Sequence, residues 1–184
     1  MKILSFGGSN SKRSINKQLS NYCASLFEEA EVSSIDLNDF QMPLFSVDLE
    51  EEIGIPEQAN AFLSEIDSCD LIVLSLAENN GSYNVGFKNI LDWSSRVKGR
   101  KVFAEKPMFL MATSTGARGG QAVLDGAAKR FPFMGAKILD TFSLPLFDTN
   151  FDVTNAQISN DEFRNQLITK VQSIQVALGV ASEK

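Results

Sequence analysis

"KILSFGGSNSKRSIN", residues 2–16, is the stretch that decides the fold of this 184-residue chain. Its first half is a short, β-rich run that ends at Gly7-Gly8, and its second half opens a helical pattern. Apolar residues then recur every three or four positions; they are Ile15, Leu19, Tyr22, Cys23, Leu26 and Phe27. A strand, a glycine turn and a helix in this order form the first unit of an alternating β/α chain.

The same alternation continues along the chain. The patterns predict strands at 32–37, 71–76, 108–112 and 137–142, and helices at 56–66, 85–96, 121–131 and 163–178. Strand 108–112 is apolar throughout, as expected of a strand that is covered on both faces. We expect the acidic stretch 48–52 to be a solvated loop and residues 144–159 to form a further loop.

Strands that alternate with helices predict a parallel sheet whose right-handed crossovers place helices on both faces. We therefore expect one α/β domain over residues 1–184, a three-layer sandwich with a five-stranded parallel sheet in the flavodoxin-like order 2-1-3-4-5. In that order, ligands bind beyond the carboxyl ends of the strands, at the switch between strands one and three. Three polar or glycine-rich loops follow strands one, three and four, so all three are expected at this edge.

Composition excludes several classes of function. The net charge of −6 argues against a nucleic-acid or anionic-membrane partner, because both require clustered Lys and Arg. The absence of histidine excludes Ser-His-Asp and Cys-His catalysis and histidine zinc sites, and no metal is expected. Cys23 and Cys69 lie inside apolar elements and are predicted to be buried structural thiols. With no membrane-length apolar stretch and no signal-peptide profile, we expect a cytoplasmic protein that acts on small molecules.

The first loop, residues 8–16, offers hydroxyls, amides, two cations and the start of a helix. Free backbone N–H groups and the helix dipole together favour an anion such as phosphate at this place. Ser14 is also explained as a simple N-cap, but capping leaves Ser9, Ser11 and Asn16 without a role. The loop contains neither a Gly-Lys-Ser/Thr sequence nor the G-x-G-x-x-G pattern.

The second loop, residues 78–82, is explained in two ways. It is either a polar turn around its Asn-Gly pair or a set of amides that face the edge of a planar group above the phosphate. In the helix that follows, Lys88, Asn89, Asp92 and Trp93 form either an exposed, salt-bridged face or part of a subunit interface.

The third loop, residues 114–120, contains three glycines, which permit close approach of the backbone to a ligand but also suit a plain connection. Taken together, the three loops offer a phosphate site at one end, with amides and flexible backbone at the other. They contain no acid and base placed for proton transfer. This combination favours a cofactor that supplies its own chemistry.

The sequence resembles the NAD(P)H-dependent FMN reductase family, which includes quinone, chromate and azo-dye reductases of flavodoxin-like fold. The family pattern G-S-x-x-x-x-S-x-N is matched in the first loop, and P-E-Y-N-x-S followed by K-N-x-x-D-W is matched approximately in the second. The matching residues are Gly8, Ser9, Ser14, Asn16, Glu78, Asn80, Ser82, Lys88, Asn89, Asp92 and Trp93. Ala77 and Asn79 stand where the family often has Pro and Tyr. Ser11 stands where a basic residue is common, and Lys12 or Arg13 is positioned to replace it.

The resemblance implies bound FMN, with NAD(P)H as the electron donor and hydride transfer at flavin N5, so that no catalytic side chain is expected. It also implies a homodimer or homotetramer that pairs through the helix after the second loop. The expected phosphate ligands are Ser9, Ser11, Ser14, the backbone N–H of Ile15, and Asn16. Expected contacts to the ribityl chain and ring are Glu78, Asn79, Asn80, Ser82, Ser114, Thr115 and Gly116, with Arg118 near the reduced ring or the nicotinamide nucleotide.

The function expected is therefore that of an FMN-dependent NAD(P)H oxidoreductase that reduces free flavin, a quinone or a similar small acceptor. Two alternatives remain open. One is a flavodoxin-type electron carrier, although the first loop departs from the usual phosphate loop of such carriers. The other is a flavin-poor interaction protein of the same fold, in which Asn79 in place of Tyr has weakened cofactor binding.

Overall fold

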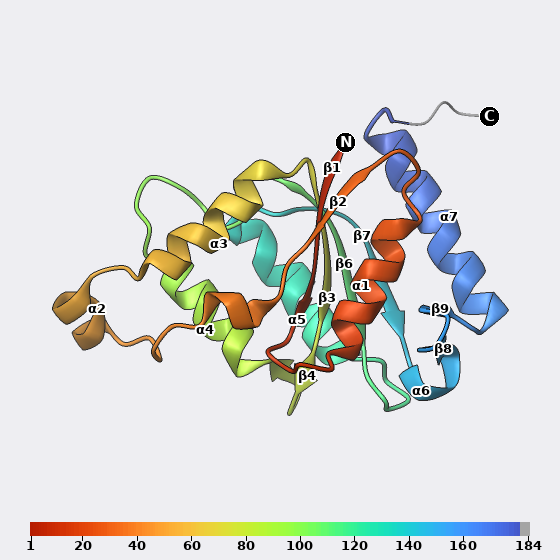
Figure 1. Ribbon diagram of the computed structural model, residues 1–184, viewed down its shortest axis with the longest axis horizontal. Helices are drawn as coiled ribbons and strands as arrows, with labels where there is room; N and C mark the ends of the chain where they lie inside the picture. Colours follow the sequence, from red (N-terminus) through yellow and green to blue (C-terminus); the bar gives the residue numbers. More distant parts are fainter. Residues whose placement is uncertain (181–184) are drawn as a thin grey trace.

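A computed structural model describes residues 1–180 of the chain. A five-stranded parallel sheet runs through the centre of the molecule (Figure 1). Its strands are β1 (Lys2–Gly8), β2 (Glu31–Ser34), β3 (Leu71–Leu76), β6 (Pro107–Thr113) and β7 (Lys137–Leu144). They are ordered β2-β1-β3-β6-β7, which confirms the predicted order. The last four residues of the expected domain, 181–184, lie outside the described residues.

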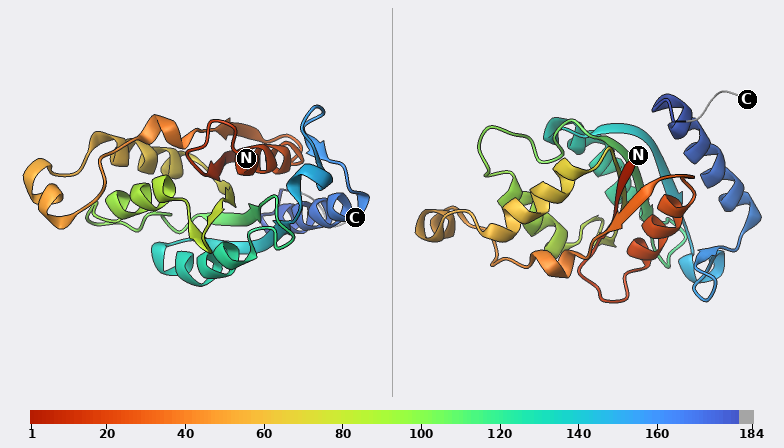
Figure 2. Two further views of the ribbon diagram at one scale, coloured as in Figure 1. Left: turned by 90° about the horizontal axis from the view of Figure 1, so that it is seen from below. Right: turned by 45° about the horizontal axis from the view of Figure 1, so that its top comes forward.

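Five longer helices cover the two faces of the sheet (Figure 2). They are α1 (Ile15–Ser25), α3 (Glu57–Ser68), α4 (Val85–Ser94), α5 (Gln121–Arg130) and α7 (Asp161–Ala177). Strand side chains alternate between the faces, so that Leu4 and Phe6 pack with α3, α4 and α5, whereas Ile3 packs with α1 and α7. The three-layer sandwich is therefore confirmed.

Short elements complete the described part of the chain. The short helices are η1 (Leu37–Phe40), α2 (Val47–Ile53), η2 (Phe131–Met134) and α6 (Phe147–Asn150). Two small hairpins pair β4 (Glu78–Asn79) with β5 (Ser82–Tyr83) and β8 (Phe151–Asp152) with β9 (Gln157–Ile158). None of the helices formed by residues 1–180 has the length and apolar character that a bilayer crossing requires.

The prediction of a loop at 48–52 is wrong, because these residues lie in α2. Ser46 caps this helix, with its hydroxyl accepting a hydrogen bond from the backbone N–H of Leu49 (3.1 Å). Asp48 and Glu50 lie in the first turn, where the helix dipole favours negative charge. No residue of α2 is buried, so the helix is solvated as expected of so acidic a segment.

Other boundaries also differ from the predictions. The predicted strand 32–37 is too long, because β2 ends at Ser34 and Leu37 begins η1. Residues 144–159 are not a plain loop, because they contain α6 and the β8–β9 hairpin. β1 continues through Gly7-Gly8 instead of ending before them. A Cβ at Gly7 would lie 2.5 Å from the backbone N of Lys17, so only glycine lets α1 pack this closely against β1.

The two cysteines behave as predicted. Cys23 and Cys69 are buried and unpaired. Burial raises the pKa of Cys69 to about 11 and that of Cys23 well above its usual value. Both thiols are therefore neutral packing groups at physiological pH.

Candidate functional site

The loops after β1, β3 and β6 meet at the carboxyl edge of the sheet, at the lower side of Figure 1. Between them lies a cavity of about 230 Å³, here called the α1 cavity. It is lined by Ser9, Ser11, Arg13, Ser14, Ile15, Asn16, Ala77, Glu78, Thr113, Ser114 and Thr115. All three loops that the sequence singled out thus contribute to one site.

The lining includes most of the expected cofactor-binding residues. Those that line the α1 cavity are Ser9, Ser11, Ser14, Ile15, Asn16, Glu78, Ser114 and Thr115. Those outside its lining are Asn79, Asn80, Ser82, Gly116 and Arg118. Arg13, Ala77 and Thr113 line the cavity in addition.

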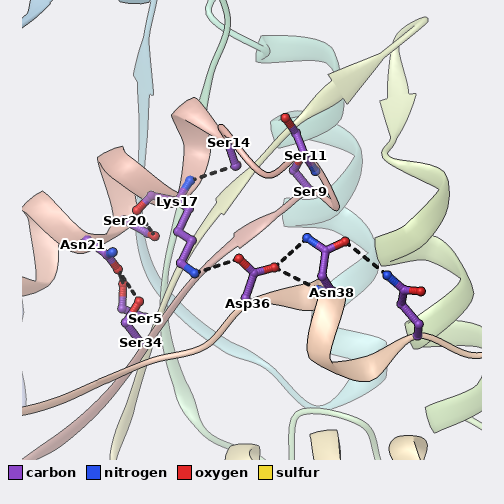
Figure 3. Close-up of polar contacts among 11 residues, drawn as sticks. Ser5, Ser9, Ser11, Ser14, Lys17, Ser20, Asn21, Ser34, Asp36 and Asn38 are labelled. Atoms are coloured by element: carbon purple, nitrogen blue, oxygen red, sulfur yellow. Dashed lines mark hydrogen bonds and ion pairs between the residues drawn. The ribbon is translucent and has the colours of Figure 1, made fainter. Parts of the chain in front are cut away.

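The turn between β1 and α1 presents hydroxyls and free backbone donors to the cavity. Figure 3 shows Ser9, Ser11 and Ser14 following one another along this turn. Ser14 is the N-cap of α1 and accepts a hydrogen bond from the backbone N–H of Lys17 (3.1 Å), so its capping role is confirmed. Within residues 1–180, the backbone N–H groups of Ile15 and Asn16 form no hydrogen bond. Two unpaired donors at a helix N-terminus suit an anion.

The charges around the cavity also suit an anion. Arg13 is the only basic residue in the lining, and it forms no ion pair with residues 1–180. Glu78 lines the cavity too, but its carboxylate accepts a hydrogen bond from the backbone N–H of Val123 (3.1 Å) in the first turn of α5. The negative charge of Glu78 therefore stabilises the positive end of α5.

The side chain of Asn16 is occupied inside the protein. Its Oδ1 accepts hydrogen bonds from the Ser75 hydroxyl (2.7 Å) and from the backbone N–H of Thr113 (3.0 Å). Its Nδ2 donates to the carbonyl of Thr113 (3.2 Å). Asn16, on α1, is thereby joined to β3 and β6. Its expected contact with a phosphate stays a prediction, and the groups that remain for it are the backbone N–H and one N–H of the carboxamide.

The second loop folds into the β4–β5 hairpin. Asn80 and Gly81 both have positive φ (52° and 76°), as a type I′ turn requires, so the polar-turn interpretation holds. Asn84 is the N-cap of α4, and its Nδ2 donates to Asn79 (3.2 Å) and to Asn10 in the first loop (3.1 Å). Sequence reasoning missed both Asn10 and Asn84, although an Asn directly before a helix is a capping signal.

The helix after the second loop has the expected salt-bridged face, whereas its part in a subunit interface stays a prediction. Lys88 and Asp92 form an exposed i,i+4 ion pair (2.6 Å). Trp93 is buried, and its Nε1 donates to the carbonyl of Pro43 (2.7 Å). Asn89 also bonds to this region, since it donates to the carbonyls of Met42 and Pro43 and accepts from the N–H of Phe45. These two side chains hold the segment that leads into α2.

A chain of polar contacts anchors α1 beside the cavity (Figure 3). The Lys17 ammonium bonds to Asp36 (2.9 Å), whose other oxygen accepts from the backbone and side chain of Asn38. Burial alone would raise the pKa of Asp36, but the hydrogen bonds from Asn38 and Lys17 outweigh it and lower that pKa below 3.8. Asp36 is therefore ionised at neutral pH and fixes Lys17 outside the α1 cavity.

The size of the α1 cavity limits what it holds. Pockets that enclose a drug-sized ligand measure about 300–1,000 Å³, so a cavity of about 230 Å³ suits a phosphate with part of a polyol chain. The ring system of a flavin would then lie outside it, near the β4–β5 hairpin and the third loop. The free donors, the hydroxyls and Arg13 fit the phosphate of FMN.

Comparison with known sequences agrees with this geometry. The family profile described as NADPH-dependent FMN reductase matches residues 1–149. A 2-hydroxy-1,4-benzoquinone reductase from a Burkholderia species is 36% identical over 120 residues, which are 65% of this chain and 63% of that protein. A quinone reductase of Escherichia coli (strain K12) is 34% identical over 79 residues, 43% of this chain and 42% of that protein. The matches thus span less than two thirds of either relative.

Comparison with solved structures confirms the flavodoxin-like fold. The flavoenzyme NAD(P)H:(acceptor) oxidoreductase FerB from Paracoccus denitrificans superimposes with a TM-score of 0.75 at 21% identity, covering 94% of this chain and 93% of that one. The FMN-dependent NADH-azoreductase from Bacillus anthracis, solved in complex with FMN, gives a TM-score of 0.60 at 13% identity, covering 96% and 98%. At these identities the likeness concerns the fold alone.

Proposed function

Because the chain belongs to the NADPH-dependent FMN reductase family, we propose that it is an FMN-dependent NAD(P)H oxidoreductase. Its acceptor is free flavin, a quinone or a similar small molecule. The observation that carries the proposal is the α1 cavity, where free N–H groups, hydroxyls and one unpaired arginine surround a phosphate-sized space. The quinone reductases among its relatives support a quinone as acceptor.

The residues of the site have binding roles in this proposal. The phosphate lies against the hydroxyls of Ser9, Ser11 and Ser14 and the backbone N–H groups of Ile15 and Asn16. The ribityl chain and ring lie against Glu78, Asn79, Asn80, Ser82, Ser114, Thr115 and Gly116. Arg118, exposed within the third loop, contacts the reduced ring or the nicotinamide nucleotide.

Bound FMN supplies the hydride-accepting and hydride-donating atom N5, which is chemistry that no side chain offers. The chain itself holds and orients the flavin. The first loop fixes one end through the phosphate, and the hairpin and third loop limit the direction in which the ring extends. No catalytic acid or base is therefore proposed.

We also propose that the molecule is a homodimer, or a homotetramer built by pairing dimers. The arm, residues 41–56, extends from the body of the molecule (Figure 1) and carries α2, which has no buried residue. Exposed apolar side chains lie on the arm and on the adjacent start of α4, including Leu44 (73% exposed) and Val85 (64%). A second copy that covers these side chains would remove them from water. The cytoplasmic location stays a prediction.

Purified protein tests the proposed activity. We expect a flavin absorbance spectrum, release of FMN on heating, identified by its mass, and NADPH or NADH oxidation that accelerates when 1,4-benzoquinone is added. FMN binding without this turnover would identify an electron carrier instead. If reconstitution with excess FMN gave no bound flavin, the chain would be an interaction protein of the same fold.

A further inference from the structure

Asn16 connects parts of the site that are distant in sequence. It is the second residue of α1, is only 3% exposed, and makes its side-chain hydrogen bonds with Ser75 on β3 and Thr113 at the end of β6. A carboxamide has two acceptor lone pairs and two donor hydrogens. Both acceptor positions and one donor hydrogen are used here, which leaves one N–H of the carboxamide without a hydrogen bond to residues 1–180.

The contact with Thr113 completes the edge of the sheet. The β3–β6 ladder ends with Leu76 beside Ala112. The next residue of β6, Thr113, has both its N–H and its carbonyl paired with the carboxamide of Asn16. On its other side, the hydroxyl of Thr113 donates to the carbonyl of Leu144 on β7 (2.7 Å). Thr113 is therefore held from two directions where the third loop begins.

We infer that the Asn16 side chain is a positioning group. It holds the start of the third loop next to the first loop, residues 8–16, and does not itself bind phosphate. Ser114 and Thr115, which line the α1 cavity, directly follow the residue that Asn16 holds. Ser75 supports the carboxamide from β3 without lining the cavity. The inference rests on the proposed flavin site.

This role predicts a pattern of flavin affinities that a phosphate-binding side chain would not produce. Loss of a side chain that binds the phosphate weakens the binding of FMN but not that of riboflavin, which lacks the phosphate. A group that positions the third loop matters for both, because that loop approaches the ribityl chain and the ring that the two flavins share. We therefore expect Asn16→Ala to lower the affinities for FMN and for riboflavin by similar factors, about tenfold.

The experiment titrates apoprotein with FMN and with riboflavin for the wild type, Asn16→Ala, Ser75→Ala and Ser11→Ala. Ser75→Ala removes one buried hydroxyl that lies outside the cavity, so it tests the same connection with less risk to folding. We expect it to weaken both flavins about two- to fivefold. Ser11→Ala, in the exposed part of the turn, is the control and should weaken FMN alone.

Loss of FMN affinity alone in Asn16→Ala, with Ser75→Ala unchanged, would overturn the inference. A second readout is independent of flavin: hydrogen exchange of the amides at 114–116 should accelerate in Ser75→Ala apoprotein. If the wild type bound no flavin, the proposed function would fail, and exchange would still decide the positioning role. Unchanged exchange in that variant would refute it.

Discussion

Arg13 supplies the positive charge of the α1 cavity. It lines the cavity, whereas its neighbour Lys12 does not. A hydrogen bond to a charged group contributes about 1.5–3 kcal/mol, and solvent screening of the exposed Arg13 reduces this. We expect Arg13→Gln to weaken FMN about three- to tenfold, with riboflavin unaffected, in a fluorescence titration.

Lys12→Gln is the matched control, since it removes the same charge one residue away. The effect of Arg13→Gln should also shrink as salt is added, because an exposed charge interaction is screened. Equal losses in the two variants would mean that the net charge of the turn matters and not the placement of Arg13.

Asp36 makes the anchoring of α1 depend on pH. Its pKa lies below 3.8 in the folded protein, so the stabilisation is present above about pH 3.8 and is lost as pH falls through the lowered value. We expect Asp36→Asn to melt at a lower temperature than the wild type at pH 7, and the difference to narrow below pH 4. Thermal denaturation of both proteins between pH 3 and pH 7 measures this difference in melting temperature. A difference that stays constant with pH would show that the ionised Asp36 is not its source.

At the scale of elements, Asn84 has two roles: it caps α4, and it links the β4–β5 hairpin to the first loop. Two substitutions distinguish these roles. Ser caps a helix nearly as well as Asn, whereas Ala costs about 1 kcal/mol. Asn84→Ser should thus leave the melting temperature close to that of the wild type, and Asn84→Ala should lower it. Both variants lose the Nδ2 donor that joins Asn79 to Asn10.

For FMN affinity we expect both Asn84 variants to be weaker than the wild type, about two- to fivefold, because neutral exposed hydrogen bonds contribute little. Titration with FMN beside thermal denaturation separates the two roles. If Asn84→Ser bound FMN as tightly as the wild type, the link between the hairpin and the first loop would have no part in the site.

The elements that the sequence predicted best are those whose apolar residues form a clear pattern, either a helical repeat or a continuous run. β3 was predicted to the residue because a buried strand is a continuous apolar run. α2 was missed because its charges outweighed weaker signals, namely a serine before the helix (Ser46) and a glycine after it (Gly54). The β8–β9 hairpin has only two residues in each strand, which is too short for any period.

The site was predictable in its location and less so in its contacts. Strand order alone brought the three loops together. The bonds of Asn16 to Thr113 and of Asn84 to Asn10 join residues 97 and 74 positions apart, so they depend on the folded arrangement. Sequence patterns report local periodicity and carry no information on such contacts.

At the scale of the whole molecule, the arm gives the clearest test of assembly. Asn89 and Trp93 hold its base, Arg96 pairs with Glu50 on α2 (2.7 Å), and Leu44 remains exposed. We expect Leu44→Glu to shift the protein from dimer to monomer in sedimentation or light-scattering measurements, because the charge would have to be buried at the interface.

The control for assembly is Val153→Glu, which places the same charge in the turn of the β8–β9 hairpin, at a side chain that is 60% exposed. It should leave the dimer intact. A wild type that is monomeric at high concentration, or a Leu44→Glu variant that stays dimeric, would contradict pairing through the arm.

The Asn16–Thr113 contact bears on when the protein acquires its cofactor during synthesis. The first loop, residues 8–16, is synthesised before the strands that fix it, because β3 and β6 follow it in the chain. β1 pairs with β3, and Asn16 bonds to the end of β6. A nascent chain that has completed only α1 therefore has the loop's residues without its geometry. In the proposed site, flavin binding therefore requires that β6 has been synthesised and has paired with the rest of the sheet.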